Sequence, residues 1–435
     1  MIAPGPRGHL LLGSLPDARR DPIAMFQRAF NDHGDVARLR FGTMTAHLIS
    51  SPAGVNHVLA ENNKNYGKQT RGFKNLRRVM GNGLLTSEGE FWKKQRRLAQ
   101  PAFHRQKIQG FGESMLRAAD RCAARLARAT APVDVAAEMM QVTLEIVCET
   151  LLGTQVSGEA ERVHEVMGLL LRSANERMTR IIDLPPPLPT RENRALQGWL
   201  RVLDGIVLRI IAERRKAPGD DLISMLLAAR DEETGETMTD AQLRDEAMTI
   251  FLAGHETTAN ALTWTWLLLS RYPAAARALR AELGSAPLTV AGLPRLPLLK
   301  MTVEESMRLY PPAWLVARSA TGADEIGGYE IPAGSIVFVS PYVVHRHPRL
   351  WRDPEGFDPQ RFASAETLPR GAYFPFGGGP RQCIGNGFAM MEAQLVLGTL
   401  LQKFALELVP GHRVEAEPSI TLRPRYGMRM AVRPA

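Results

Sequence analysis

The sequence predicts a mainly helical fold with a smaller β region. Several long stretches of the 435-residue chain repeat apolar residues at helical spacing, and the longest has no proline from Thr239 until Pro273. Short runs of alternating apolar and polar residues occur at 36–49, at 326–339 and beyond 405, which is typical of strands. No charged or Ser/Gly-rich linker divides the chain, so we expect residues 1–435 to form a single domain.

Composition excludes several classes of protein. Hydrophobic residues make up 45% and charged residues 23%, as in soluble globular proteins. The formal charge is +9, but the basic residues are scattered and no nucleic-acid recognition motif is present, so an acidic protein is a better candidate partner than a nucleic acid. The N-terminal apolar run is broken by Gly13 and Pro16, too short for a membrane span and unlike a signal peptide. We therefore expect a cytoplasmic monomer.

The N-terminal region predicts a hairpin followed by a short helix. Val36–Phe41 and Ala46–Ile49 are strand-like and flank Gly42. Ser51-Pro52 is a typical helix start, and the helix is expected to reach about Asn62. The stretch from Tyr66 to Thr86 has no clear period, so we expect a long loop with at most one short helix.

The middle and C-terminal regions predict further helices and strands. Pro185 to Pro189 cannot be helical because proline lacks an N–H donor and clashes with the preceding turn, so this segment is a predicted loop. A second hairpin is predicted around Pro332-Ala333-Gly334, and turns at Gly411 and Gly427 should separate short C-terminal strands. The predicted helices are Glu90–Arg97, Val163–Arg180, Glu192–Arg215 and Lys300–Tyr310, and the pattern from Phe111 to about Leu152 is also helical.

The longest helix starts at a capping box, Thr239 to Gln242, and would extend roughly 50 Å. Its middle reads AGHETT, from Ala253 to Thr258, and small residues there share one face. Gly254 costs about 1 kcal/mol relative to alanine in a helix interior, so a neighbouring helix or a ligand should need the missing side chain. Glu256 and Thr257 are polar in an apolar setting, and buried polar groups need partners.

A glycine-rich stretch, FGGGPRQCIG from Phe376 to Gly385, leads directly into another helical segment. Glycines let the backbone bend and let a flat group approach closely. Cys383 lies at or beside a helix N-terminus, where N–H groups and the helix dipole favour a thiolate. Such a thiolate can be a nucleophile, a redox sensor or the single ligand of a haem iron. The other two cysteines, Cys122 and Cys148, lie in apolar helical contexts and are predicted to be inert.

These motifs together resemble the cytochrome P-450 family. Phe376, Gly379, Arg381, Cys383 and Gly385 match its ligand loop, F-x-x-G-x-R-x-C-x-G. The AGHETT segment is similar to its oxygen-binding groove, and Glu305-x-x-Arg308 followed by L-Y-P-P is similar to its K-helix, with Arg361 as the expected partner in FDPQRF. The motifs span nearly the whole chain. HRHP at 345–348 departs from the family's H-R-D-P, so we expect a local change in polarity at His347.

The resemblance implies roles for particular residues. Cys383 would hold haem b through an axial thiolate, between the long central helix and the cysteine-loop helix. Thr257 would orient dioxygen and its water, Glu256 would relay protons, and His255 would be structural. Glu305, Arg308 and Arg361 would form a buried network that holds the ligand loop against the core. At Trp92, Arg96 and Arg318, polar groups would reach the haem propionates. Further cofactor contacts are implied at Arg381, Phe376, Ala253, Gly254 and Gly385.

The implied function is insertion of one oxygen atom from O2 into an apolar small molecule, such as a fatty acid, a terpenoid or a steroid-like compound. A separate ferredoxin or flavodoxin, with its reductase, would supply electrons at a basic surface that includes Lys93, Lys94 and Arg97. The pocket would be lined by Tyr66–Thr86, Ser173–Thr190 and Ile250–Ala261. The alternatives are a peroxide-driven peroxygenase, a non-catalytic haem-thiolate module and a cysteine hydrolase. A peroxygenase usually lacks an acid–alcohol pair such as Glu256 and Thr257.

Overall fold

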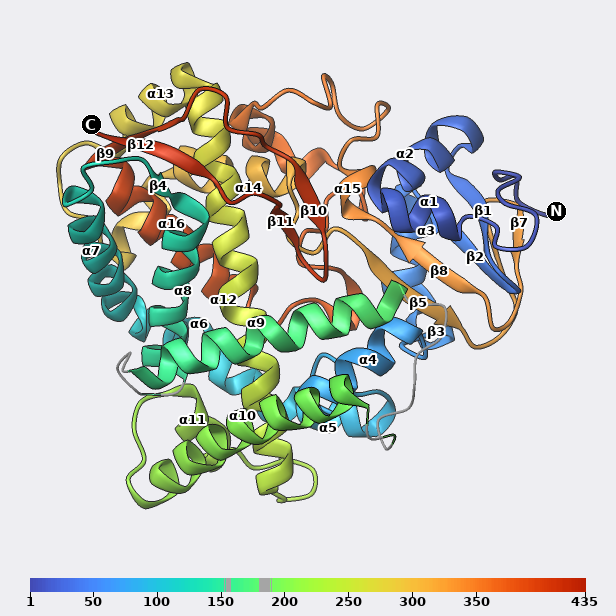
Figure 1. The fold of residues 1–435 in the computed structure, drawn as a ribbon, viewed down its shortest axis with the longest axis horizontal. Coiled ribbons are helices and arrows are strands. Elements are labelled where there is room, and N and C mark those ends of the chain that lie inside the picture. The colour runs from blue at the N-terminus through green and yellow to red at the C-terminus, as the bar shows by residue number, and fades with distance from the viewer. Residues whose placement is uncertain (152, 154–157, 180–187, 189) are drawn as a thin grey trace. The chain divides into compact units, whose positions relative to one another are not determined.

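The computed structural model describes residues 1–151, 153, 158–179, 188 and 190–435 (Figure 1). Their contacts group into two compact units. We call Met1–Arg71, Lys300–Cys383 and Ala416–Arg423 the sheet unit, and Gly72–Leu299, Ile384–Glu415 and Pro424–Ala435 the helical unit. Among the described residues, we find no helix that is long and apolar enough to cross a bilayer.

The sheet unit is built on a five-stranded sheet in the order β1-β2-β8-β5-β3. The predicted N-terminal hairpin is confirmed, because β1 and β2 pair antiparallel from Val36↔Ile49 to Phe41↔Met44. One neighbouring pair, β2 and β8, runs parallel. The strands are β1 (Val36–Phe41), β2 (Met44–Ile49), β3 (Tyr66–Gly67), β5 (Val316–Ala320), β6 (Asp324–Ile326), β7 (Tyr329–Ile331), β8 (Ile336–Val339), β10 (Ala416–Pro418) and β11 (Leu422–Pro424).

Short helices surround this sheet. Ser51 caps α3 as predicted, since its hydroxyl accepts a hydrogen bond from the Gly54 N–H at 3.2 Å. The helix then continues as a π-helical turn, η1, instead of a regular α-helix. The helical elements of the unit are α1 (Leu15–Arg20), α2 (Pro22–His33), α3 (Pro52–Asn56), η1 (His57–Glu61), η2 (Asn63–Asn65), most of α14 (Pro297–Leu309), α15 (Pro341–Val344), η5 (Pro359–Thr367) and η6 (Gly379–Arg381).

The predicted position of the second hairpin's turn is wrong. β6 pairs with β7 around Gly327 and Gly328, whose φ angles of 59° and 82° suit a tight two-residue hairpin turn. The residues after Pro332-Ala333-Gly334 form β8, which pairs with β2 and β5 instead of β7. Two glycines with positive φ therefore determine this turn more strongly than the Pro-Ala-Gly sequence does.

The helical unit is organised around α12, which runs from Asp240 to Arg271 and has 32 residues. Its predicted capping box is confirmed: the Gln242 N–H donates to the Thr239 hydroxyl, and the Thr239 N–H donates to the Gln242 side chain. α12 packs along α8 (Val135–Leu151) and also contacts α10 (Arg191–Lys216) and α16 (Asn386–Leu401), as Figure 1 shows.

The remaining elements of the helical unit complete its surface. A three-stranded antiparallel sheet has the order β4-β12-β9, with positive φ at Gly411 and Gly427 in the predicted turns. The elements are α4 (Arg71–Met80), α5 (Gly89–Ala99), η3 (Gln100–Phe103), α6 (Arg105–Gly110), α7 (Gly112–Ala127), β4 (Val133–Asp134), α9 (Gly158–Thr179), α11 (Leu222–Ala228), α13 (Pro273–Leu283), η4 (Val290–Arg295), β9 (Phe404–Leu408) and β12 (Arg429–Pro434).

The helical pattern from Phe111 to about Leu152 is divided between two helices, α7 and α8. Pro132 stops a continuous helix there, and Val133 then pairs with Met430 of β12. The loop predicted at Pro185 to Pro189 lies almost wholly outside the described residues, as does the end of the predicted pocket segment Ser173–Thr190.

Candidate active site

The cysteine loop has a fixed backbone and an exposed thiol. The Cys383 N–H donates to the Phe376 carbonyl at 2.9 Å, which closes the loop. Gly377 and Gly379 have φ angles of 71° and 63°, a region that side chains other than glycine rarely adopt. Gly385 is the N-cap of α16, so Cys383 lies just before a helix N-terminus, as predicted. Phe376 and Arg381 are both partly exposed in the same loop.

The three cysteines differ in a way that identifies one candidate ligand. Burial raises the pKa of both Cys122 and Cys148 to about 12, so these side chains stay protonated thiols at neutral pH. Cys383 is exposed. Because metals bind the thiolate, only Cys383 fits the haem ligand that the sequence implies.

The middle of α12 presents small residues on an otherwise buried helix. Ala253 is exposed and Thr257 is partly exposed, whereas Phe251, Leu252 and Thr258 around them are buried. The Thr257 hydroxyl donates to the Ala253 carbonyl one turn earlier at 2.6 Å. A short uncovered stretch with one hydroxyl is therefore open to a ligand along this helix, which fits the predicted groove for a flat cofactor.

Gly254 lies against a neighbouring helix, and its predicted cofactor contact stays a prediction. A Cβ atom built at this position would lie 3.1 Å from Val147 and 3.6 Å from Leu151, both on α8. The missing side chain thus allows α8 and α12 to pack closely, which was the alternative to a cofactor contact. His255 is buried, and its Nδ1 lies 2.9 Å from the Phe251 carbonyl, in agreement with a structural role. Glu256 is also buried, 7% exposed.

The predicted propionate contacts lie on two elements. Trp92 and Arg96 are partly buried, one turn apart on α5. Arg318 is a buried residue of β5, and its guanidinium donates to the Ala317 carbonyl at 2.9 Å. These are suitable donors for carboxylates, and their cofactor role stays a prediction.

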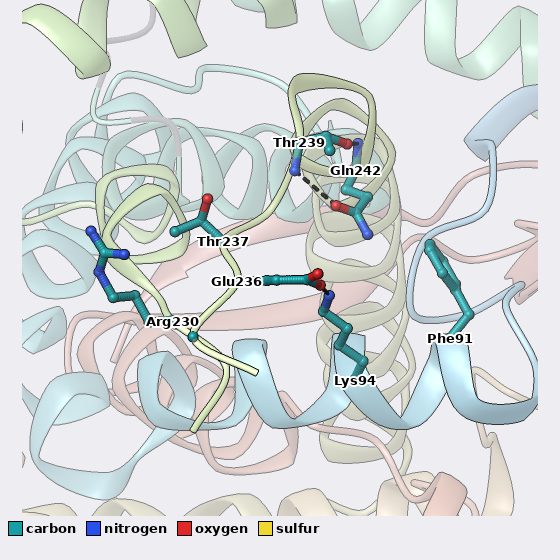
Figure 2. A pocket seen from close by; sticks show the side chains of 8 residues that line it. Phe91, Lys94, Arg230, Glu236, Thr237, Thr239 and Gln242 are labelled. Atoms are coloured by element: carbon teal, nitrogen blue, oxygen red, sulfur yellow. Dashed lines mark hydrogen bonds and ion pairs between the residues drawn. The ribbon is translucent and has the colours of Figure 1, made fainter. Parts of the chain in front are cut away.

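The predicted electron-donor surface on α5 is less basic than the sequence suggested. Lys93 pairs with Glu90 at 2.6 Å, Lys94 pairs with Glu236, and Arg97 lies 3.0 Å from Asp231 and 2.9 Å from Glu233. The Lys94–Glu236 pair crosses an open pocket of about 680 Å³ between α5 and the start of α12 (Figure 2). Carboxylates therefore offset all three positive charges, and none of the predicted cofactor residues lines this pocket.

Glu305, Arg308 and Arg361 form the predicted network, and Arg361 is its one partly exposed member. Arg308 and Glu305 are fully buried and form two hydrogen bonds, at 2.7 and 2.9 Å. The other Arg308 donors bind the carbonyls of His345, Pro354 and Gly356, so all five N–H groups have an acceptor. Arg361 donates to Glu305 at 3.2 Å.

The network acts on the ligand loop indirectly. Its backbone partners lie in 345–358, and Arg361 also donates to the Arg352 and Asp353 carbonyls. The link continues through His345, whose Nε2 accepts the Phe374 N–H at 3.0 Å. Burial, followed by the Arg308 and Arg346 charges, lowers the pKa of His345, so its ring is neutral and able to accept.

His347, which stands where the family's motif has an aspartate, contacts a carboxylate from another segment. Its Nε2 lies 3.0 Å from Asp35, and its Nδ1 accepts the Arg349 N–H at 3.1 Å. The ring is 2% exposed, so both nitrogens are satisfied without contact with water. The expected local change in polarity at His347 stays a prediction.

Sequence reasoning missed two buried acids. Glu392 of α16 is fully buried; burial raises its pKa well above the usual range, and the neighbouring Thr258 hydroxyl opposes this only in part. Glu246 of α12 is also fully buried, and one carboxyl oxygen accepts the Leu84 N–H at 3.1 Å. Burial raises the pKa of Glu246 to about 7. Both lie in helical segments, where a charged residue alone does not indicate which face it occupies.

Arg308→Lys should strongly destabilise the protein. Lysine cannot replace a planar group with five donors, so buried carbonyls and the Glu305 carboxylate would lose partners. We expect a loss of about 3–5 kcal/mol in the free energy of unfolding, measured by urea denaturation. Lys300→Gln is the control, since its pair with Glu304 on α14 is exposed and should contribute at most about 1 kcal/mol. Equal effects of the two variants would contradict the network's importance.

Glu246→Gln should change how stability depends on pH. The folded-state pKa of about 7 exceeds the ordinary value of 4.5, so the unfolded chain releases its proton first as pH rises. The wild type therefore loses stability between pH 4.5 and about 7, by at most about 3 kcal/mol. The introduced amide oxygen would still accept the Leu84 N–H without this loss. Urea denaturation should show similar stabilities at pH 5 and a more stable variant at pH 8.

Glu113→Gln, an exposed carboxyl on α7, serves as the control for this comparison. If the difference between wild type and Glu246→Gln is the same at both pH values, Glu246 does not titrate as described.

Comparison with known proteins supports one family. A family model described as "Cytochrome P450" matches residues 3–428. Cyclooctatin synthase from Streptomyces melanosporofaciens is 37% identical over 436 residues, which cover 97% of this chain and 93% of that protein. Pentalenene oxygenase from Streptomyces avermitilis is 34% identical over 411 residues, covering 92% and 88%.

A solved structure agrees with the sequence relatives. The crystal structure of the cytochrome P450DA heme domain aligns with a TM-score of 0.90 and 29% identity, over 100% of this chain and 98% of that chain. The predicted mixed fold, mainly helical with small sheets, is confirmed. The chain therefore belongs to the cytochrome P450 family, whose members are oxygen-incorporating oxidoreductases with haem b held by a cysteine thiolate.

Proposed function

We propose that this protein is a monooxygenase that hydroxylates a terpenoid, with Cys383 as the haem ligand. The exposed thiol of Cys383, in contrast to the two buried thiols, is the observation that carries the ligand assignment. The terpenoid class is supported by relatives named for cyclooctatin and pentalenene, at 37% and 34% identity. A fatty acid or steroid-like substrate fits the same apolar chemistry. Residues 1–435 would act as one haem domain.

Haem b, when bound, supplies the activation of dioxygen, with the thiolate donating electron density. The protein's own residues control protons and water. The Thr257 hydroxyl donates to the Ala253 carbonyl and keeps its lone pairs for a water, which it can thereby orient. Glu256, next to it and buried, would pass protons inward from solvent.

Glu392 would hold a proton close to the same stretch of α12. Its neighbour Thr258 follows Thr257 directly, and the raised pKa of Glu392 keeps its carboxyl neutral at physiological pH. A neutral carboxylic acid can donate a hydrogen bond, which a carboxylate cannot. The helical unit therefore places two acids beside the AGHETT segment, one from α12 itself and one from α16.

Electrons would come from a separate ferredoxin or flavodoxin with its reductase, in a cytoplasmic, monomeric enzyme. The overall charge of +9 favours an acidic partner. The ion pairs of Lys93, Lys94 and Arg97 make α5 alone a weak docking surface. We therefore expect that neutralising Lys93 and Lys94 would have little effect on electron transfer.

Thr257→Ala should separate electron consumption from product formation. Without the hydroxyl, water near α12 is no longer oriented, so reduced oxygen is lost as hydrogen peroxide. We expect product per electron pair to fall at least about 10-fold, measured with a cyclic terpene, a ferredoxin and its reductase. Thr257→Ser keeps a hydroxyl and is the matched control. A Thr257→Ala variant that is as well coupled as wild type would contradict this role.

Isotope labelling distinguishes the peroxygenase alternative. In a monooxygenase, one atom from ¹⁸O2 appears in the product when electrons come from the redox partner. In a peroxygenase, the label comes from H2¹⁸O2, and no electron donor is required. Turnover of no apolar substrate, with a donor that demonstrably reduces the haem, would instead favour a non-catalytic haem-thiolate module.

A further inference from the structure

The π-helical turn η1 lies in the sheet unit between α3 and η2. π-helical turns are rare and often occur at functional sites, because they carry an extra residue that disturbs regular packing. The hydrogen bond from the Asn62 N–H to the His57 carbonyl, at 2.9 Å, spans five residues and defines the turn. Val58 and Leu59 within it are buried in the unit's core. Something outside the turn must favour this geometry over a regular helix.

One carboxylate oxygen binds both ends of the turn. Oδ2 of Asp324 lies 2.8 Å from Nε2 of His57, the first residue of η1. It also accepts the side-chain N–H of Asn62, the C-cap of η1, at 2.9 Å. The Tyr66 hydroxyl donates to the same oxygen at 2.6 Å. Asp324 belongs to β6, so a distant hairpin holds the turn closed from outside.

The Asp324 carboxylate is held in its charged form. Burial disfavours ionisation, but hydrogen bonds from Tyr66, His57, the Glu325 N–H and Asn62 outweigh it and lower the pKa of Asp324 to about 2. Burial and the bond to Asp324 raise the pKa of Tyr66, which therefore remains a donor. Hydrogen bonds to an ionised acceptor are stronger than neutral ones. The contacts of Asp324 with His57, Asn62 and Tyr66, which we call the clamp, therefore persist across the physiological pH range.

The middle of the same turn lies against the cysteine loop. A Cβ atom at Gly379 would overlap the Leu59 carbonyl oxygen and lie 2.8 Å from the Ala60 Cα. Such a close approach leaves no room for a side chain, so the two backbones touch directly. The Gly379 carbonyl in turn accepts the N–H of Gln382, the residue before Cys383, at 3.1 Å. A displacement of η1 would therefore move Gly379, and through Gln382 it would also move the adjacent Cys383.

We propose that Asp324 is a positioning residue for the haem ligand. By binding His57 and Asn62, it fixes η1, and η1 fixes the backbone of Gly379 and hence the direction of the Cys383 thiolate. His57, Asn62 and Tyr66 act through the same carboxylate. This inference rests on the proposed role of Cys383 as ligand, but the mechanical link from Asp324 to the loop is a property of the sheet unit.

The test uses four variants of the haem-loaded protein. Asp324→Ala removes the acceptor, and His57→Ala removes one donor at a half-buried position, which protects the test if Asp324→Ala does not fold. His57→Gln retains an N–H that can reach the carboxylate and should restore wild-type behaviour. Glu325→Gln changes a charge on the adjacent, exposed residue of β6 and serves as the matched control.

Two readouts report on the loop. Hydrogen–deuterium exchange of peptides covering 376–383 should become several-fold faster in Asp324→Ala and His57→Ala, together with exchange in 57–62. The red-shifted carbon monoxide band of the reduced protein should decay several-fold faster in the same two variants. His57→Gln and Glu325→Gln should match the wild type in both measurements.

Faster exchange in 57–62 without any change in 376–383 would overturn the proposal, because the turn would then not brace the loop. Unchanged exchange in both segments would also overturn it, because Asp324 would not be a clamp. A wild-type protein without a red-shifted band would refute the haem-ligand assignment instead, and the exchange experiment would still decide whether Asp324 holds the loop.

Discussion

The buried pair of Arg308 and Glu305 is the interaction on which the sheet unit depends most. A fully buried guanidinium is tolerated only where every donor has an acceptor, and Arg308 meets this condition with one carboxylate and three backbone carbonyls. The chain from 345 to 361 is thereby fixed, and His345 connects it to Phe374, two residues before the cysteine loop. The loop is thus anchored at its beginning by this network and touched at Gly379 by η1.

The helical unit differs in that it holds several acidic side chains inside an apolar core. Glu256, Glu392 and Glu246 are all buried, and burial raises the pKa values of the last two. Glu392 lies beside Thr258 of the AGHETT segment, where we propose that it holds a proton. Glu246 binds the loop at Leu84, where its ionisation lowers stability as the pH rises. Similar side chains therefore serve different purposes because of their neighbours.

Much of this arrangement could be predicted from sequence, because local signals and structure agree. The capping box at Thr239 and the hairpin at 36–49 follow from short local motifs, whereas the Glu305–Arg308–Arg361 set is expected only from the family resemblance. Long-range pairing could not be predicted: β8 joins β2 and β5, and Val133 pairs with β12, through contacts that no local pattern encodes. The same applies to Gly254, whose reason lies on α8, and to Asp324, which is linked to His57 only by the fold.

The carbon monoxide difference spectrum of the reduced protein shows whether Cys383 is the thiolate ligand of the haem. We expect a red-shifted Soret band in the wild type, in Cys122→Ala and in Cys148→Ala, and its loss in Cys383→Ala. That pattern would establish Cys383 as the thiolate ligand. A wild-type spectrum without the red shift, or a Cys383→Ala variant that keeps it, would contradict the account.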